Sequence, residues 1–201
     1  MAPNNYFGNM KAATMMSHLT LWFTAAAIIV FGIIITKAED NQTAATKPRC
    51  AVTAGEKAPA FQARTVDGKT INFPDDYKGK VVLLDFWATW CGPCRRELPN
   101  VTAAYQKYHT NGFEIVSVSM DAPRQGPALL QFFKEHGMTW PQIYDGTSGK
   151  TLAAVKYGVQ GIPCPVLVDG DTGIVLAVGA DAIGHRLTRV LEPALAAKNK
   201  K

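Results

Sequence analysis

Two cysteines, Cys91 and Cys94, lie at the junction between a strand and a helix, and this junction constrains the fold more than any other feature of the chain. The apolar run at 81–87 comes just before them and is typical of a strand buried within a sheet. The segment that starts at Arg95 begins a helix. The cysteines therefore lie near a helix N-terminus, where the backbone dipole and the free N–H groups favour a thiolate.

A pair of cysteines separated by two residues is either a redox pair or half of a zinc site. In disulfide exchange the first cysteine attacks a partner's disulfide and the second resolves the mixed disulfide. Tetrahedral zinc needs four ligands, and the remaining cysteines, Cys50 and Cys164, and the histidines have no paired ligand spacing. The sequence therefore favours redox chemistry by Cys91 and Cys94, with no metal and no cofactor.

Strands and helices alternate along the rest of the chain. A turn signal at Asp67-Gly68 predicts a hairpin within residues 58–73. Further strands are expected at 114–120, 140–144, 165–168 and 174–178, and helices at 95–109, 127–136, 151–157 and 182–191, the last ending near Pro193. This order of elements predicts an α/β sandwich around one mixed sheet.

The N-terminal part contains an uncharged apolar run at residues 19–36. A helix of this length spans roughly 27 Å, which is close to the thickness of a bilayer's hydrocarbon core. One interpretation is a cleaved signal peptide with a small-x-small site at 36–38, and the other is an uncleaved anchor. The length of the run, and Lys37 inside that site, favour the anchor.

The anchor divides the chain into five expected parts. These are a cytoplasmic segment (1–18), a transmembrane signal anchor (19–36), a tether (37–53), the folded domain (54–197) and a basic tail (198–201). Lys11 before the run and Glu39 and Asp40 after it place the N-terminus inside and the domain outside. The net charge of +5 forms no basic stripe with interleaved aromatic residues, which argues against a nucleic-acid partner.

Residues 85–94 (DFWATWCGPC) together with Gly161-Ile162-Pro163 resemble the thioredoxin superfamily, and within it the membrane-tethered TlpA/ResA-like thiol–disulfide oxidoreductases. The resemblance extends over about residues 54–197. It implies a thioredoxin-like sandwich, a central mixed sheet flanked by helices, with an N-terminal hairpin. It also implies an inserted helix and strand between Met120 and Tyr157.

The resemblance implies roles for residues around the cysteine pair. Cys91 is expected to attack and Cys94 to resolve. The Ile162–Pro163 bond is expected to be cis, so that the Ile162 backbone is presented to an extended substrate strand. The residues expected to bind the substrate are Trp90, Gly92, Pro93, Ile162 and Pro163.

Two acidic residues match positions of functional interest in such proteins. Asp85 matches the buried acid of thioredoxin, where many TlpA-type proteins have Asn, and it can accept a proton from the resolving thiol. The alternative is a solvent-exposed acid at a strand end. Glu97 matches an acidic position that ResA-like proteins place beside the cysteines, but an acid is also common in any first helical turn.

Cys164 departs from the pattern, because most relatives have Thr or Ser directly after the cis-proline. Three alternatives remain open. Cys164 can be a small buried residue without chemistry, it can form a structural disulfide with Cys50, or it can exchange with Cys91 as an internal redox partner. The choice depends on a Cα separation that the sequence does not give.

The function expected is that of a single-pass protein of a bacterial inner membrane whose domain reduces protein disulfides in the periplasm. The Gly92-Pro93 dipeptide is that of thioredoxin, which favours a reductant. Such a reductant needs a transmembrane electron donor, and the resemblance suggests a role in cytochrome c maturation. The alternatives are a disulfide oxidant or isomerase, and a tethered non-catalytic peptide-binding module.

Overall fold

The computed structural model describes residues 49–200. The expected cytoplasmic segment, the apolar run at 19–36 and most of the expected tether lie outside these residues. Within the described range, no helix combines the length and the apolar character that crossing a membrane requires.

The centre of the domain is a five-stranded mixed sheet with the strand order β5-β4-β3-β6-β7. Its strands are β3 (Val81–Trp87), β4 (Phe113–Ser119), β5 (Gln142–Ile143), β6 (Cys164–Asp169) and β7 (Val175–Val178). Strand β3 pairs in parallel with β4 and antiparallel with β6. Because it is central and covered on both faces, its sequence is apolar almost throughout, as predicted.

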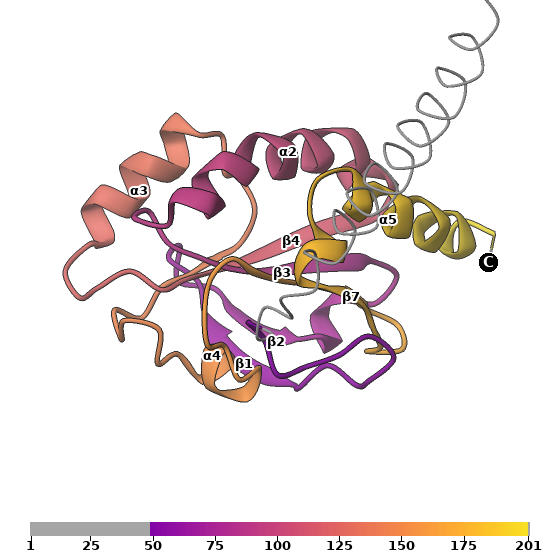
Figure 1. The fold of residues 1–201 in the computed structure, drawn as a ribbon, viewed down its shortest axis with the longest axis horizontal. Helices are drawn as coiled ribbons and strands as arrows, with labels where there is room; N and C mark the ends of the chain where they lie inside the picture. Colours follow the sequence, from indigo (N-terminus) through magenta and orange to yellow (C-terminus); the bar gives the residue numbers. More distant parts are fainter. Residues whose placement is uncertain (1–48, 201) are drawn as a thin grey trace, which may run out of the picture. The chain divides into compact units, whose positions relative to one another are not determined.

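Helices cover one face of this sheet, and a hairpin with a short helix covers the other (Figure 1). The first face packs against α2 (Gly92–Tyr108), α3 (Gly126–Glu135) and α5 (Gly184–Lys198). The second packs against α4 (Leu152–Lys156) and the antiparallel hairpin of β1 (Phe61–Arg64) and β2 (Thr70–Phe73). The predicted α/β sandwich, mixed sheet and hairpin are therefore confirmed.

Side chains on β3 alternate between the two cores with the period of two that a strand imposes. Val82, Leu84 and Phe86 lie in the core beneath the hairpin. Leu83 and Trp87 lie in the core beneath α2. Asp85 is in register with this second set, so the fold directs its carboxyl group toward the helix that carries the cysteines.

The structure corrects two predicted boundaries at the C-terminal end. Helix α5 does not end near Pro193 but continues to Lys198, because its buried stripe of Leu187, Leu191 and Leu195 extends past the proline. Lys198 is therefore no part of a solvated tail. Its side chain is 9% exposed, and its Nζ lies 2.7 Å from an Asp171 carboxylate oxygen.

The folded part also begins earlier than residue 54. Cys50 and Val52 are buried against the domain, and the Ala51 amide donates to the Tyr157 carbonyl at 2.9 Å. The expected tether at 37–53 is therefore too long at its C-terminal end, because its last residues carry apolar side chains that the domain covers.

Candidate active site

Cys91 and Cys94 form a disulfide with a Cα–Cα distance of 5.3 Å. Cys91 is the N-cap of α2, and its Sγ accepts a hydrogen bond of 3.2 Å from the Cys94 backbone N–H. The helix begins at Gly92, earlier than the predicted residue 95. When the pair is reduced, this N–H and the helix dipole favour negative charge on the Cys91 sulfur.

A buried carboxylate holds the loop that leads into the cysteines. Asp121, at the end of β4, is 2% exposed. Its two oxygens accept hydrogen bonds from the Thr89 backbone N–H at 3.1 Å, the Thr89 hydroxyl at 2.6 Å and the Ser119 hydroxyl at 2.8 Å. The sequence analysis missed Asp121. Its position directly after a strand beside β3 was the available signal, because parallel strands end at the same edge of a sheet.

Behind Cys94 lies a narrow cavity that brings together four of the predicted site residues. These residues come from β3, α2 and the loop before β6, and they are Asp85, Cys94, Glu97 and Pro163. The peptide bond between Ile162 and Pro163 is cis. The fold thus places the resolving cysteine, both acids and the cis-proline around one small space.

Asp85 is partly buried and lines this cavity, and its carboxyl group forms no hydrogen bond with another described side chain or backbone group. Burial raises the pKa of Asp85 to about 7, and the nearby negative charge of Glu97 contributes further. A carboxyl group with this pKa is protonated and ionised in comparable amounts near neutral pH. Asp85 is therefore able to accept a proton from the neighbouring Cys94 thiol.

Glu97 connects the cysteine helix to α5. Its Oε1 accepts a hydrogen bond of 2.6 Å from the Gly184 backbone N–H, and its Oε2 accepts one of 3.1 Å from the Asn100 amide. A carboxylate at the start of α5 is favourable because the N–H groups there are otherwise unpaired. Glu97 thus has two effects, which are to hold α2 against α5 and to raise the pKa of Asp85.

The residues expected to bind substrate surround the cysteines on the surface. Trp90 is 67% exposed, and Gly92 and Pro93 are exposed in the first turn of α2. Ile162 is partly buried, and its carbonyl accepts a hydrogen bond of 2.5 Å from the Arg49 guanidinium. Arg49 was not predicted to reach this loop.

Cys164 forms a disulfide with Cys50, with a Cα–Cα distance of 5.9 Å. The two cysteines lie in the core beneath the hairpin, whereas Cys91 and Cys94 lie in the core beneath α2. The sheet therefore separates the two sulfur pairs. Of the three alternatives for Cys164, the structure contains the disulfide with Cys50.

Within residues 49–200, no group of three or more His, Cys, Asp or Glu side chains is arranged to hold a metal ion. All four cysteines are paired with one another.

Comparisons with known proteins give a consistent result. The profile of the AhpC/TSA family matches residues 54–178. The thiol–disulfide oxidoreductase ResA of Bacillus thuringiensis subsp. konkukian is 33% identical over 138 residues, which cover 69% of this chain and 76% of that protein. ResA of Bacillus subtilis (strain 168) is 34% identical over 127 residues, which cover 63% of this chain and 68% of that protein.

Solved structures agree with the sequence comparisons. The thioredoxin domain of a thiol-disulfide oxidoreductase from Bacteroides vulgatus superposes with a TM-score of 0.62 at 28% identity, covering 72% of this chain and 99% of that one. A thiol:disulfide interchange protein from Bacteroides sp. gives a TM-score of 0.61 at 28% identity, covering 72% and 91%. The chain is therefore similar in sequence and in fold to proteins of thiol–disulfide exchange.

Asp85→Asn is expected to change how stability depends on pH. Since the pKa of Asp85 is raised to about 7, its contribution to stability is complete below about pH 4 and is lost as the pH rises through 7. Asn does not ionise, so the variant does not lose this stability as the pH rises. The difference in the free energy of unfolding, variant minus wild type, should therefore increase by about 2–4 kcal/mol between about pH 4 and pH 8. Urea unfolding at several pH values measures the difference, with the exposed Asp75→Asn variant as control. A constant difference between variant and wild type would contradict the burial of the Asp85 charge.

Replacing Cys50 and Cys164 together by Ala is expected to lower the free energy of unfolding by about 2–5 kcal/mol. The reason is that this disulfide joins residues 114 positions apart, and closing a long loop constrains the unfolded chain most. The matched control is the Cys91→Ala/Cys94→Ala double variant, because that disulfide joins residues only 3 positions apart. Denaturant unfolding without reductant measures both. Equal losses in the two double variants would show that loop closure is not the stabilising effect.

Proposed function

Because this chain belongs to the AhpC/TSA family and is a thioredoxin-like thiol–disulfide oxidoreductase similar to ResA, we propose that it reduces protein disulfides on the outer side of a membrane. The observation that carries the exchange chemistry of this proposal is the asymmetry of the cysteine pair. Cys91 Sγ accepts the N–H bond at the start of α2, whereas Cys94 faces the cavity that contains Asp85.

This asymmetry assigns the attack on the substrate to Cys91 and the resolution of the mixed disulfide to Cys94. The Cys91 thiolate attacks one sulfur of the substrate disulfide, the substrate S–S bond breaks, and the other substrate sulfur leaves as a thiolate and takes up a proton. The Cys94 thiol then gives its proton to Asp85 and attacks the Cys91 sulfur. The second substrate sulfur is released and protonated, and the protein is left with its Cys91–Cys94 disulfide.

The docking of the substrate uses the exposed surface around Cys91. An extended substrate strand pairs with the backbone at Ile162, before the cis-proline, by adding a short strand contact. The exposed ring of Trp90 lies next to Cys91 in sequence and supplies apolar contact area. These contacts hold the substrate disulfide beside the attacking sulfur.

The sequence also supports the cellular setting that we propose. The uncharged run at 19–36 supports a single-pass anchor in a bacterial inner membrane, with the domain in the periplasm. A reductant in that compartment gives up two electrons for each disulfide it reduces and becomes oxidised itself, so a transmembrane donor of electrons has to restore the dithiol. Apocytochrome c, whose haem-attachment cysteines must be reduced, is the substrate that we propose.

A Cys94→Ser variant of the full chain is expected to accumulate mixed disulfides through Cys91, because the resolving thiol is absent. The adducts are captured from bacterial cells after acid quenching, and the joined proteins are identified by peptide mass analysis. The Cys91→Ser variant is the control and should form no such adduct. Adducts that contain only cytoplasmic proteins would contradict the extracytoplasmic placement, and absence of Cys91 adducts would contradict the mechanism.

The direction of exchange is tested by the reduction potential of the Cys91–Cys94 pair. We expect a value close to that of thioredoxin, about −270 mV, since the two residues between the cysteines are the same Gly-Pro dipeptide. Equilibration with glutathione redox buffers and quantification of the free thiols gives the value. A potential near about −120 mV, as in strong periplasmic oxidants, would instead establish a disulfide oxidant.

A further inference from the structure

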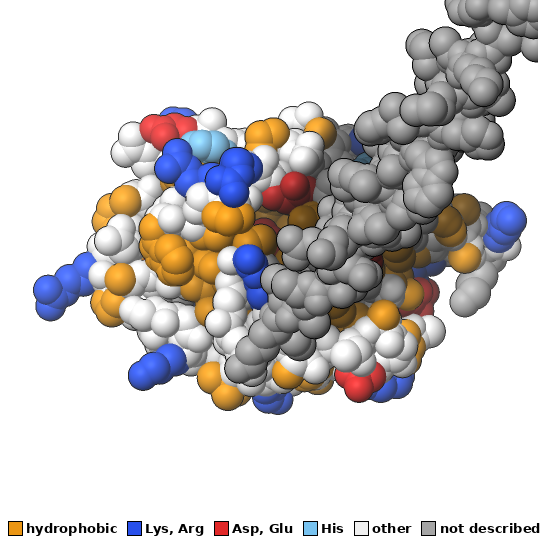
Figure 2. Space-filling model, in the orientation of Figure 1, with side chains coloured by type: hydrophobic (Ala, Val, Ile, Leu, Met, Phe, Trp, Pro, Cys, Tyr) orange, Lys and Arg blue, Asp and Glu red, His pale blue; other side chains and the backbone are white. Residues whose placement is uncertain are grey.

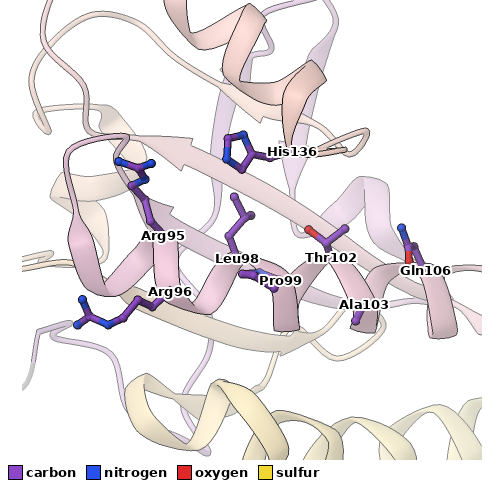
Figure 3. Close-up of a pocket in the computed structure, with 8 residues that line it drawn as sticks. All are labelled: Arg95, Arg96, Leu98, Pro99, Thr102, Ala103, Gln106 and His136. Carbon is purple, nitrogen blue, oxygen red and sulfur yellow. The ribbon is translucent and has the colours of Figure 1, made fainter.

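A groove of about 450 Å³ runs along α2 directly after the redox cysteines. Its wall is formed mainly by α2, and His136, just after α3, closes its far side (Figure 3). In the close-up, Arg95 and Leu98 extend from α2 toward the side on which His136 lies, while Arg96 extends toward the beginning of the helix. The mechanism above makes no use of this groove.

The groove carries positive charge that the domain does not neutralise. Arg95 and Arg96 follow Cys94 directly in the sequence, and neither guanidinium forms an ion pair or a hydrogen bond with another described residue. Arg96 Nη1 lies 3.5 Å from the position that a Cβ on Gly92 would occupy, so this charge reaches back to the turn between the two cysteines. Figure 2 shows basic side chains gathered beside a histidine where α2 and α3 meet, with acidic side chains at the edges of this group and an exposed apolar area below it.

Two further polar side chains, Thr102 and His136, belong to the wall of the groove. The Thr102 hydroxyl is buried and has no hydrogen-bond partner among the described residues, and an unpaired buried hydroxyl is unfavourable unless a partner arrives. The His136 ring stacks on Phe132, with 3.9 Å between ring centroids, and its Nδ1 lies 3.0 Å from the Phe132 carbonyl oxygen. Nδ1 therefore donates to this carbonyl, and Nε2 of the neutral ring is left as an acceptor that suits a peptide N–H.

The floor between these polar groups is apolar. Leu98 and Pro99 lie between the arginines and Thr102 along the helix, and both line the groove. A ligand that matches this surface has carboxylates at the end near the cysteines and apolar side chains farther along. Guanidinium groups prefer carboxylates because their planar donors fit two oxygens at once.

We propose that this groove binds an acidic segment of the substrate protein that flanks its disulfide. The inference rests on the proposed disulfide reductase function and adds the class of substrate. A polypeptide whose disulfide lies at Cys91 continues past the first turn of α2, where the two unpaired arginines attract its acidic side chains. The positive charge also accelerates encounter with such substrates at low ionic strength.

The test compares two disulfide-bonded peptides that are identical except that Glu residues beside one cysteine are replaced by Gln. The full chain, reduced beforehand with a small dithiol that is then removed, is expected to reduce the Glu peptide with a second-order rate constant about 3- to 10-fold higher at low salt. This ratio should fall toward one at high salt. The Arg95→Gln/Arg96→Gln variant should lose the preference. The Arg95→Glu/Arg96→Glu variant should reverse it toward a peptide with Lys at the same positions.

The matched control removes two exposed arginines from another helix, of which Arg186 lies 3.7 Å from an Asp181 carboxylate oxygen. The Arg186→Gln/Arg189→Gln variant of α5 has the same change in net charge and should keep the wild-type ratio. An equal loss of preference in this control would show that overall charge, and not the groove, causes the preference.

Reduction of the neutral hydroxyethyl disulfide separates the groove proposal from the proposed function. If wild type reduces it but treats both peptides equally, only the groove proposal fails, and if it reduces no disulfide, the proposed function fails.

Discussion

The pairing of β3 with β4 on one side and with β6 on the other is the constraint on which the active site depends. The parallel pair places the end of β4, with Asp121, beside the end of β3, and Asp121 fixes the loop before Cys91. The antiparallel pair places the start of β6 there as well, since Phe86 is in register with Cys164. The cysteines, the anchoring acid and the cis-proline therefore meet at one edge of the sheet, although they come from distant parts of the sequence.

Strand β3 also contains Asp85, an acidic residue whose ionised form is unfavourable for the stability of the fold. A strand covered on both faces favours apolar residues, and six of the seven in β3 are apolar. Asp85 is the exception, and burial is the main reason for its raised pKa. Glu97 adds a second negative charge, but its own carboxylate is bound at the start of α5. The position of Asp85 in the core is unfavourable for its ionised form, and this raises the pKa of the acid next to Cys94.

The parts of the fold that were predicted correctly depend on local patterns. The β3 run and the hairpin turn at Gly68, where φ is 86°, are determined within a few residues. The end of α5 was mispredicted because Pro193 is a strong local signal, while the buried leucines that continue the helix act through tertiary packing. The role of Asp121, and the choice of Cys50 as the partner of Cys164 among the three alternatives, were not determined by the sequence for a similar reason. Each depends on a contact between segments that only the folded sheet brings together.

The two disulfides lie on opposite faces of the central sheet because side chains alternate along a strand. Pro163 lines the cavity beside Cys94, and Cys164 follows it at the first position of β6, where the side chain belongs to the opposite core. A thiol one residue from the cis-proline is therefore kept away from the reactive pair by the sheet itself. Its disulfide with Cys50 fixes the segment that carries Arg49, whose guanidinium binds the Ile162 carbonyl. The buried disulfide thus holds in place the segment whose arginine contacts the loop before the cis-proline.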